Sequence, residues 1–93
     1  MTEAQIREQI AVMAKSLYDR GYGCGSSGNI SVRLDDGFLI TPTNSSMGRL
    51  DPERLAKVDL VGNHVAGDKP SKEAFLHLAM YEERPEMTSV VVK

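Results

Sequence analysis

The stretch Gly25-Ser26-Ser27-Gly28-Asn29-Ile30-Ser31-Val32-Arg33 joins a loop rich in glycine and serine to a segment in which apolar and polar residues alternate. Glycine adopts positive φ readily, so successive backbone N–H groups can turn into one concavity that suits an anion. A nucleotide-binding P-loop follows a strand and opens a helix, whereas this loop follows a predicted helix and opens a strand. Two interpretations remain: an anion-binding loop, or an ordinary connection between a helix and a strand.

The segment before this loop has the pattern of an amphipathic helix over about residues 3–20. Thr2 and Gln5 have the spacing of a capping box, and Gly21 is a natural C-cap. The buried face is predicted from apolar residues at helical spacing: Ile6, Ile10, Met13 and Leu17.

After the loop, the alternation at Ile30, Val32 and Leu34 predicts a strand, and Asp35-Asp36-Gly37 is typical of a hairpin turn. The following elements are expected along the chain: a strand at 38–41, a short helix at 51–54, a strand at 58–61, a turn at Gly62-Asn63 and a short returning segment at 64–69.

A second helix is predicted over about residues 72–83, with Ser71 as its N-cap and Arg84-Pro85 as its end. Its core stripe is expected to consist of Phe75, Leu78 and Ala79. The run 88–92 is apolar and reads as a last, buried strand.

Composition limits the classes of function. The chain has 93 residues, enough for one small domain, and a net charge of −2, which gives no electrostatic case for nucleic acid or an anionic membrane. No segment resembles a signal peptide or a membrane span. Cys24 is the only cysteine, so no internal disulfide can form and a reducing, cytoplasmic location is expected.

Two further turns resemble anion sites. Thr41-Pro42-Thr43-Asn44 follows a strand end, and Pro70-Ser71-Lys72-Glu73 opens a helix, where free N–H groups and the positive end of the helix dipole lie. If the fold brings both turns to Gly28-Asn29, the three would form a phosphate cup. The plainer alternatives are that Ser71 only caps the helix and that Lys72 is a solvated surface lysine.

Glu73 and His77 are one helical turn apart on the same face. A carboxylate in a first helical turn is favourable by itself, and beside a substrate it could act as an acid or base. The Glu73/His77 pair could contact a metal, but two ligands do not make a site, so His77 is interpreted as a structural or hydrogen-bonding residue. His64 is expected to be exposed, and Cys24 has no partner that would make it a nucleophile.

Taken together, the order Gly-Asn-Ile-Ser-Val-Arg, Leu-Ile-Thr-Pro-Thr, Pro-Ser-Lys-Glu, Arg-Pro and Val-Val-Val resembles the amino-terminal part of the class II aldolase/adducin family. This group contains fuculose-phosphate aldolase and ribulose-phosphate 4-epimerase. The resemblance covers nearly all of residues 1–93, and within the family the chain is most similar to the 3-oxo-tetronate 4-phosphate decarboxylases.

The resemblance implies a three-layer α/β/α fold with a central, mostly antiparallel sheet, a zinc cofactor and a homotetramer. It also implies site residues by position. Glu73 matches the family's catalytic acid/base and is a candidate metal contact. The positions that match its phosphate-binding residues are Gly28, Asn29, Thr43, Asn44, Ser71 and Lys72.

Two departures from the family pattern concern the substrate. Sugar-phosphate aldolases usually carry Gly where this chain has Asn44, and Ser where it has Lys72. An added cation favours a substrate with an extra negative charge, so a zinc-dependent decarboxylation of a sugar-acid phosphate is the preferred function. The alternatives are an aldolase or epimerase acting on a sugar phosphate, and a non-catalytic module like that of adducin.

The third departure is at the end of the sequence. In the family the last strand leads into His-x-His, which supplies two of three zinc ligands, whereas here Lys93 takes the first position. The sequence is therefore interpreted as the amino-terminal portion of a longer lyase. By itself it is expected to be inactive, to bind zinc weakly, and to aggregate or associate through its apolar last strand.

Overall fold

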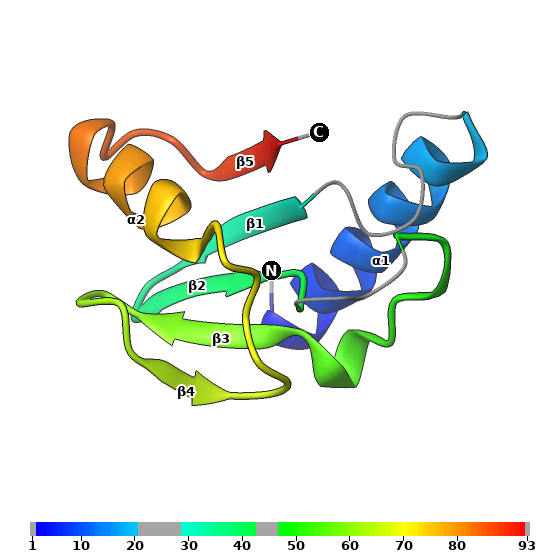
Figure 1. Cartoon of the computed structure of the whole chain (residues 1–93), viewed down its shortest axis with the longest axis horizontal. Coiled ribbons are helices and arrows are strands. Elements are labelled where there is room, and N and C mark those ends of the chain that lie inside the picture. Colours follow the sequence, from blue (N-terminus) through cyan, green and yellow to red (C-terminus); the bar gives the residue numbers. More distant parts are fainter. Residues whose placement is uncertain (1, 21–28, 43–46, 93) are drawn as a thin grey trace.

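The computed structural model describes residues 2–20, 29–42 and 47–92 (Figure 1). Two helices enclose an antiparallel five-stranded sheet with the order β4-β3-β2-β1-β5. The elements are α1 (Glu3–Asp19), β1 (Asn29–Leu34), β2 (Gly37–Ile40), the 3-10 turns η1 (Met47–Arg49) and η2 (Pro52–Arg54), β3 (Ala56–Asp59), β4 (His64–Ala66), α2 (Ala74–Glu83) and β5 (Ser89–Val92). The predicted three-layer α/β/α class is confirmed. No helix in the described ranges is both long and apolar enough to cross a membrane.

Helix α1 begins at the predicted capping box. The Thr2 hydroxyl accepts from the Gln5 N–H at 3.2 Å, and the Gln5 side chain accepts from the Thr2 N–H at 2.9 Å. The buried face is centred on Ile10 and Ala14, while Met13 is 42% exposed. The predicted stripe was therefore wrong at Met13, because Ala14 lies one helical turn after Ile10 and continues the row that faces the sheet. Gly21 lies outside the described residues.

Strand β1 contributes side chains to both faces of the sheet, because successive residues of a strand point to opposite faces. Ile30, Val32 and Leu34 belong to the apolar cluster under α1, together with Ile10 and Leu39. The opposite face of the sheet carries Phe38, Ile40, Ala56, Val58 and Val90, which pack with Tyr81 of α2. The alternation of apolar and polar residues over 29–34 thus decides which side chains of β1 face α1 and which face α2.

The hairpin between β1 and β2 forms where it was predicted, with Leu34 paired to Gly37. A side chain is excluded at Gly37, since a Cβ atom there would lie 2.0 Å from the Val58 carbonyl oxygen. Glycine therefore lets β2 and β3 approach closely enough to pair from Gly37 to Ile40.

Strand β3 starts and ends two residues earlier than the predicted 58–61. Leu60 and Val61 lie in the turn after it and are 57% and 76% exposed. The cause is Asp59, whose carboxylate accepts from the N–H groups of Val61 and Asn63 at 3.0 and 2.9 Å. An aspartate that bonds the backbone just after itself favours a turn over continued pairing.

Helix α2 differs most from its prediction. It begins at Ala74, because residues 71–73 form a turn in which the Ser71 hydroxyl accepts from the Glu73 N–H at 3.2 Å. The predicted core stripe was wrong at Phe75, which is 75% exposed, and at Ala79, which is also exposed, whereas Leu78 packs against the core as predicted. The helix instead buries His77 and Tyr81, which face polar residues of β1.

Candidate functional site

Residues that flank the three predicted anion turns meet at one corner of the sheet. The Thr41 N–H donates to the Ile30 carbonyl at 3.0 Å, and the Thr41 hydroxyl accepts from the Ile30 N–H at 3.3 Å. The Ser71 N–H donates to the Thr41 carbonyl at 3.3 Å, and Pro42 and Pro70 form an isolated antiparallel bridge. The start of β1, the end of β2 and the entry to α2 are therefore neighbours.

The predicted phosphate-binding residues fall into two groups. Three lie outside the described residues: Gly28, Thr43 and Asn44. The other three are described, with Asn29 buried at the first position of β1, Ser71 half-buried in the turn before α2, and Lys72 exposed beside it. The cup stays a prediction. Cys24 also lies outside the described residues.

Four buried polar side chains connect β1 to α2 directly beside this corner. His77 Nδ1 lies 2.6 Å from the Ser31 hydroxyl oxygen, which lies 2.7 Å from the Tyr81 hydroxyl oxygen. The other ring nitrogen, Nε2, bonds to Asn29 Oδ1. None of the four residues is more than 4% exposed. His77 is thus a hydrogen-bonding residue, as its sequence context suggested.

Burial sets the protonation of this network. It lowers the pKa of the His77 imidazole, and the negative charge of Glu73 only partly opposes that change. Burial also raises the pKa of the Tyr81 hydroxyl, against the effects of the Ser31 hydrogen bond and the Arg33 charge. Both side chains are therefore neutral near pH 7, and the network is held by neutral hydrogen bonds.

Arg33 extends the polar face of β1 to the end of α2. Its Nε donates to the Met87 carbonyl at 3.0 Å, and its terminal nitrogen donates to the Tyr81 carbonyl at 2.7 Å. The guanidinium carbon also lies 4.8 Å from the centroid of the Tyr81 ring. Arg33 therefore satisfies the Tyr81 carbonyl, which the last turn of α2 leaves without an intrahelical partner, and binds the segment after the helix through Met87.

Sequence reasoning missed Ser31, Arg33 and Tyr81. A signal was present, because Asn29, Ser31 and Arg33 are two residues apart on a predicted strand and share one face. His77 and Tyr81 are four apart on a predicted helix and also share a face. Two polar rows of this kind can pair when a helix packs on a strand.

Glu73 is exposed at the start of α2 and does not form a metal site with His77. Both imidazole nitrogens of His77 already have partners inside the protein. No group of three His, Cys, Asp or Glu side chains that could hold a metal occurs in the described ranges. The residues described here therefore do not fit a zinc ion, which needs three or four protein ligands.

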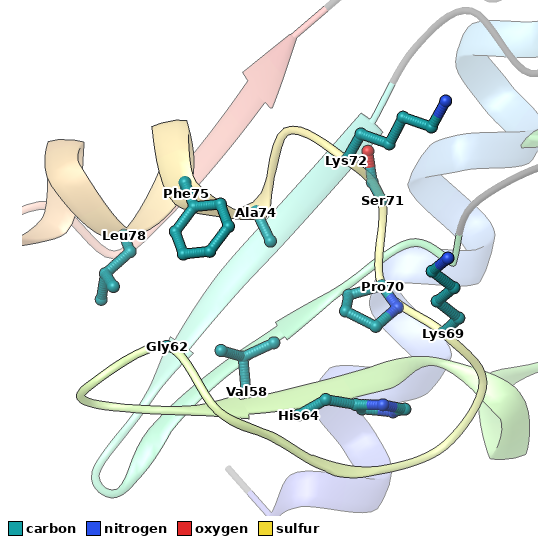
Figure 2. Close-up of a pocket in the computed structure, with 10 residues that line it drawn as sticks. All are labelled: Val58, Gly62, His64, Lys69, Pro70, Ser71, Lys72, Ala74, Phe75 and Leu78. Carbon is teal, nitrogen blue, oxygen red and sulfur yellow. The ribbon is translucent and has the colours of Figure 1, made fainter.

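A cavity of about 350 Å³ lies between the entry to α2 and the strands β3 and β4 (Figure 2). Its walls are formed by Val58, Gly62, His64, Lys69, Pro70, Ser71, Lys72, Ala74, Phe75 and Leu78. Figure 2 shows Ser71 and Lys72 at the end away from Phe75 and Leu78. The cavity thus includes two of the predicted phosphate-binding residues, next to an apolar wall. His64 is exposed, as predicted.

Comparison with known proteins finds a matching family model and several similar proteins. A family model described as the Class II Aldolase and Adducin N-terminal domain matches residues 8–91. The 3-oxo-tetronate 4-phosphate decarboxylase of Haemophilus influenzae is 52% identical over 92 residues, which make up 98% of this chain and 44% of that protein. The L-fuculose phosphate aldolase of Methanocaldococcus jannaschii is 39% identical over 85 residues, 91% of this chain and 46% of that protein.

A solved structure shows the same arrangement. The crystal structure of YgbL from Escherichia coli, described as a candidate aldolase/epimerase/decarboxylase, matches with a TM-score of 0.94 and 46% identity. The match covers 96% of this chain and 44% of YgbL, so the chain spans less than half the length of these relatives. Since the family model covers most of its residues and the fold agrees, the chain belongs to the class II aldolase and adducin family.

Proposed function

We propose that this chain is the amino-terminal part of a lyase that decarboxylates a 3-oxo-tetronate 4-phosphate. The observation that carries the proposal is the 52% identity over 92 residues to a decarboxylase of that name. Lys72 supports it, because this exposed lysine has no ion pair or hydrogen bond within the part of the chain that the structure describes. Its charge is available to a substrate that carries both a phosphate and a carboxylate.

The proposed phosphate site comprises Gly28, Asn29, Thr43, Asn44, Ser71 and Lys72. The hydrogen bonds among Ile30, Thr41 and Ser71 favour it, since they bring the backbone beside these residues to one corner. N–H groups at the entry to α2 and the Lys72 ammonium would supply positive potential there.

The proposed chemistry breaks the bond between the carboxylate and its neighbouring carbon. Carbon dioxide leaves, and the electron pair of that bond passes into the adjacent keto group as an enediolate. The enediolate carbon must then take up a proton. Glu73 is the proposed acid/base, since it follows the phosphate-binding Lys72 directly and its exposed carboxyl is free to exchange protons with water.

The cofactor, assembly and location are proposed for the full-length protein. Zinc is the proposed cofactor, which would act as a Lewis acid toward the keto oxygen, and its histidine ligands would lie outside this chain. The assembly is proposed to be a homotetramer, and the location cytoplasmic. Family membership supports these proposals.

The test is a comparison of two reactions catalysed by the full-length protein. Decarboxylation of 3-oxo-tetronate 4-phosphate is expected to be faster than cleavage of a ketose phosphate. Lys72→Ala should weaken substrate binding by about 10- to 100-fold, the loss expected for a hydrogen bond to a charged group. The matched control is Lys69→Ala, which removes another lysine of the same cavity. It should weaken substrate binding less than Lys72→Ala does. Equal KM values for the wild type and Lys72→Ala would make Lys72 a surface residue.

An aldolase or epimerase is the second candidate, and the 39% identity to an L-fuculose phosphate aldolase favours it. It would be preferred if ketose phosphate cleavage or epimerisation were the faster reaction. If the full-length protein lacked all three activities and lacked a His-x-His motif, a non-catalytic module would be indicated.

Residues 1–93 alone are expected to show no decarboxylase activity and no tight zinc binding. The described residues provide no group of three ligands, and the ligands implied by the family lie elsewhere. Calorimetric titration with zinc and a decarboxylation assay measure this directly. Stoichiometric binding tighter than about 1 μM, or turnover by this piece, would contradict the proposal that it is a portion of the enzyme.

A further inference from the structure

We infer that His77 is a positioning residue that fixes the orientation of the Asn29 carboxamide. Its Nε2–H holds Asn29 Oδ1 inside the protein, which leaves only the Nδ2 end of the amide to meet a bound anion. This inference rests on the proposed phosphate-binding role of Asn29. It adds a residue, and a direction of hydrogen bonding, to that site.

The donors and acceptors in this hydrogen-bond network can be assigned by starting from the Tyr81 hydroxyl. Within the described residues, the Tyr81 hydroxyl has one side-chain partner, the Ser31 oxygen at 2.7 Å. A buried hydroxyl uses its proton in a hydrogen bond, so Tyr81 donates to Ser31. The Ser31 proton is then directed to its other neighbour, His77 Nδ1, at 2.6 Å. Nδ1 is therefore an acceptor.

The tautomer of His77 follows from that assignment. A neutral imidazole carries one N–H, on one of its two nitrogens. Because Nδ1 accepts, the proton is on Nε2, whose partner is Asn29 Oδ1. His77 is 0% exposed and Asn29 is 4% exposed, so water cannot readily replace either partner.

The orientation of the Asn29 amide matters because its two ends are opposite in character. Oδ1 is only an acceptor, whereas Nδ2 offers two donors, and phosphate oxygens are acceptors. If the amide turned by half a rotation, Oδ1 would face the anion and repel it. Asn29 is also directly attached to Gly28 of the opening loop. A fixed donor at that point is the kind of preorganisation that a binding site needs.

The tautomer can be measured in the wild-type protein by nitrogen-15 NMR of the histidine ring. We expect His77 to carry its proton on Nε2 and to have an unprotonated Nδ1. His64 is the internal reference, because it is exposed and its ring lies outside this network. A proton on Nδ1 of His77 would overturn the inference. This measurement needs no variant.

The effect on binding is measured with two substitutions in the full-length enzyme. Glutamine at position 77 can place an amide donor near the position of Nε2, whereas asparagine is shorter and reaches only the Nδ1 side. We expect His77→Asn to raise KM by about tenfold or more, with a smaller change in kcat. His77→Gln should keep KM within about threefold of the wild type. A wild-type KM in a folded His77→Asn protein would overturn the inference.

Asn29→Asp separates this inference from the proposed function, because it replaces the Nδ2 donors with a negative oxygen. An unchanged KM in Asn29→Asp would mean that the proposed phosphate-binding role of Asn29 is wrong. A raised KM in Asn29→Asp with an unchanged KM in His77→Asn would mean that only the positioning role is wrong. If His77→Asn fails to fold, His77→Gln provides the test. A KM raised as far in His77→Gln as in Asn29→Asp would contradict positioning by the Nε2–H.

Discussion

Glu73→Gln in the full-length protein is expected to lower kcat by about 100-fold or more while KM stays close to the wild-type value. Glutamine has nearly the same shape as glutamate but cannot release or take up a proton at neutral pH. Proton transfer by a positioned side chain usually contributes about 10²–10⁴-fold to a rate. Because Glu73 is exposed in the structure, the substitution should not disturb the core.

Steady-state decarboxylation kinetics provide the measurement, and Glu83→Gln is the matched control. Glu83 is an exposed carboxylate at the other end of the same helix, so its loss should leave kcat unchanged. Wild-type turnover in Glu73→Gln would reduce Glu73 to a favourable charge at the start of α2. A raised KM with normal kcat would instead place the residue in substrate binding.

Phe38→Ala is expected to destabilise the fold by about 3–5 kcal/mol, the usual range for truncating a buried aromatic residue. Phe38 is 2% exposed in the middle strand of the sheet, and its ring centroid lies 5.4 Å from that of Tyr81. The cavity left by alanine would open beside the hydroxyl that ends the buried network. We therefore expect a loss of substrate affinity along with the loss of stability.

Urea unfolding of the full-length protein measures this effect, and Phe38→Leu is the control. Leucine keeps an apolar side chain in the site but removes the aromatic contact, so its cost should be clearly smaller. Equal stability of Phe38→Ala and the wild type would contradict the core position of Phe38. Equal losses for the alanine and leucine variants would indicate that the ring contact with Tyr81, rather than the filled volume, stabilises this side.

The hairpin of β1 and β2 could be predicted because its signals are local. Alternating residues from Ile30 to Leu34 and the turn at Asp35-Asp36-Gly37 specify a hairpin without help from the rest of the chain. The end of β3 could not be predicted by apolar content alone. Leu60 and Val61 extend the apolar run, but the carboxylate of Asp59 bonds the following N–H groups and ends the pairing.

The residues of the candidate site could be proposed from the sequence, but their contacts could not. The proposed anion-binding role of Ser71 and Lys72 rests on their position before a helix, whereas the nearness of Ser71 to Thr41 depends on a hydrogen bond between residues far apart in the sequence. The predicted buried side of α2 was wrong at Phe75 and Ala79 for a related reason. Hydrophobic periodicity assigns Phe75 to the core, but His77 and Tyr81 are buried because β1 supplies Ser31 and Asn29 as partners.

The polar seam between β1 and α2 also restricts how this interface can change, whether in evolution or in design. Replacing one of Asn29, Ser31, His77 and Tyr81 by an apolar residue leaves a buried neighbour without its partner, which costs about 1–3 kcal/mol. Replacing both partners of a pair with apolar groups of matching shape can be nearly neutral. The four positions should therefore vary as a set, so a redesigned apolar seam would have to be introduced in a single step.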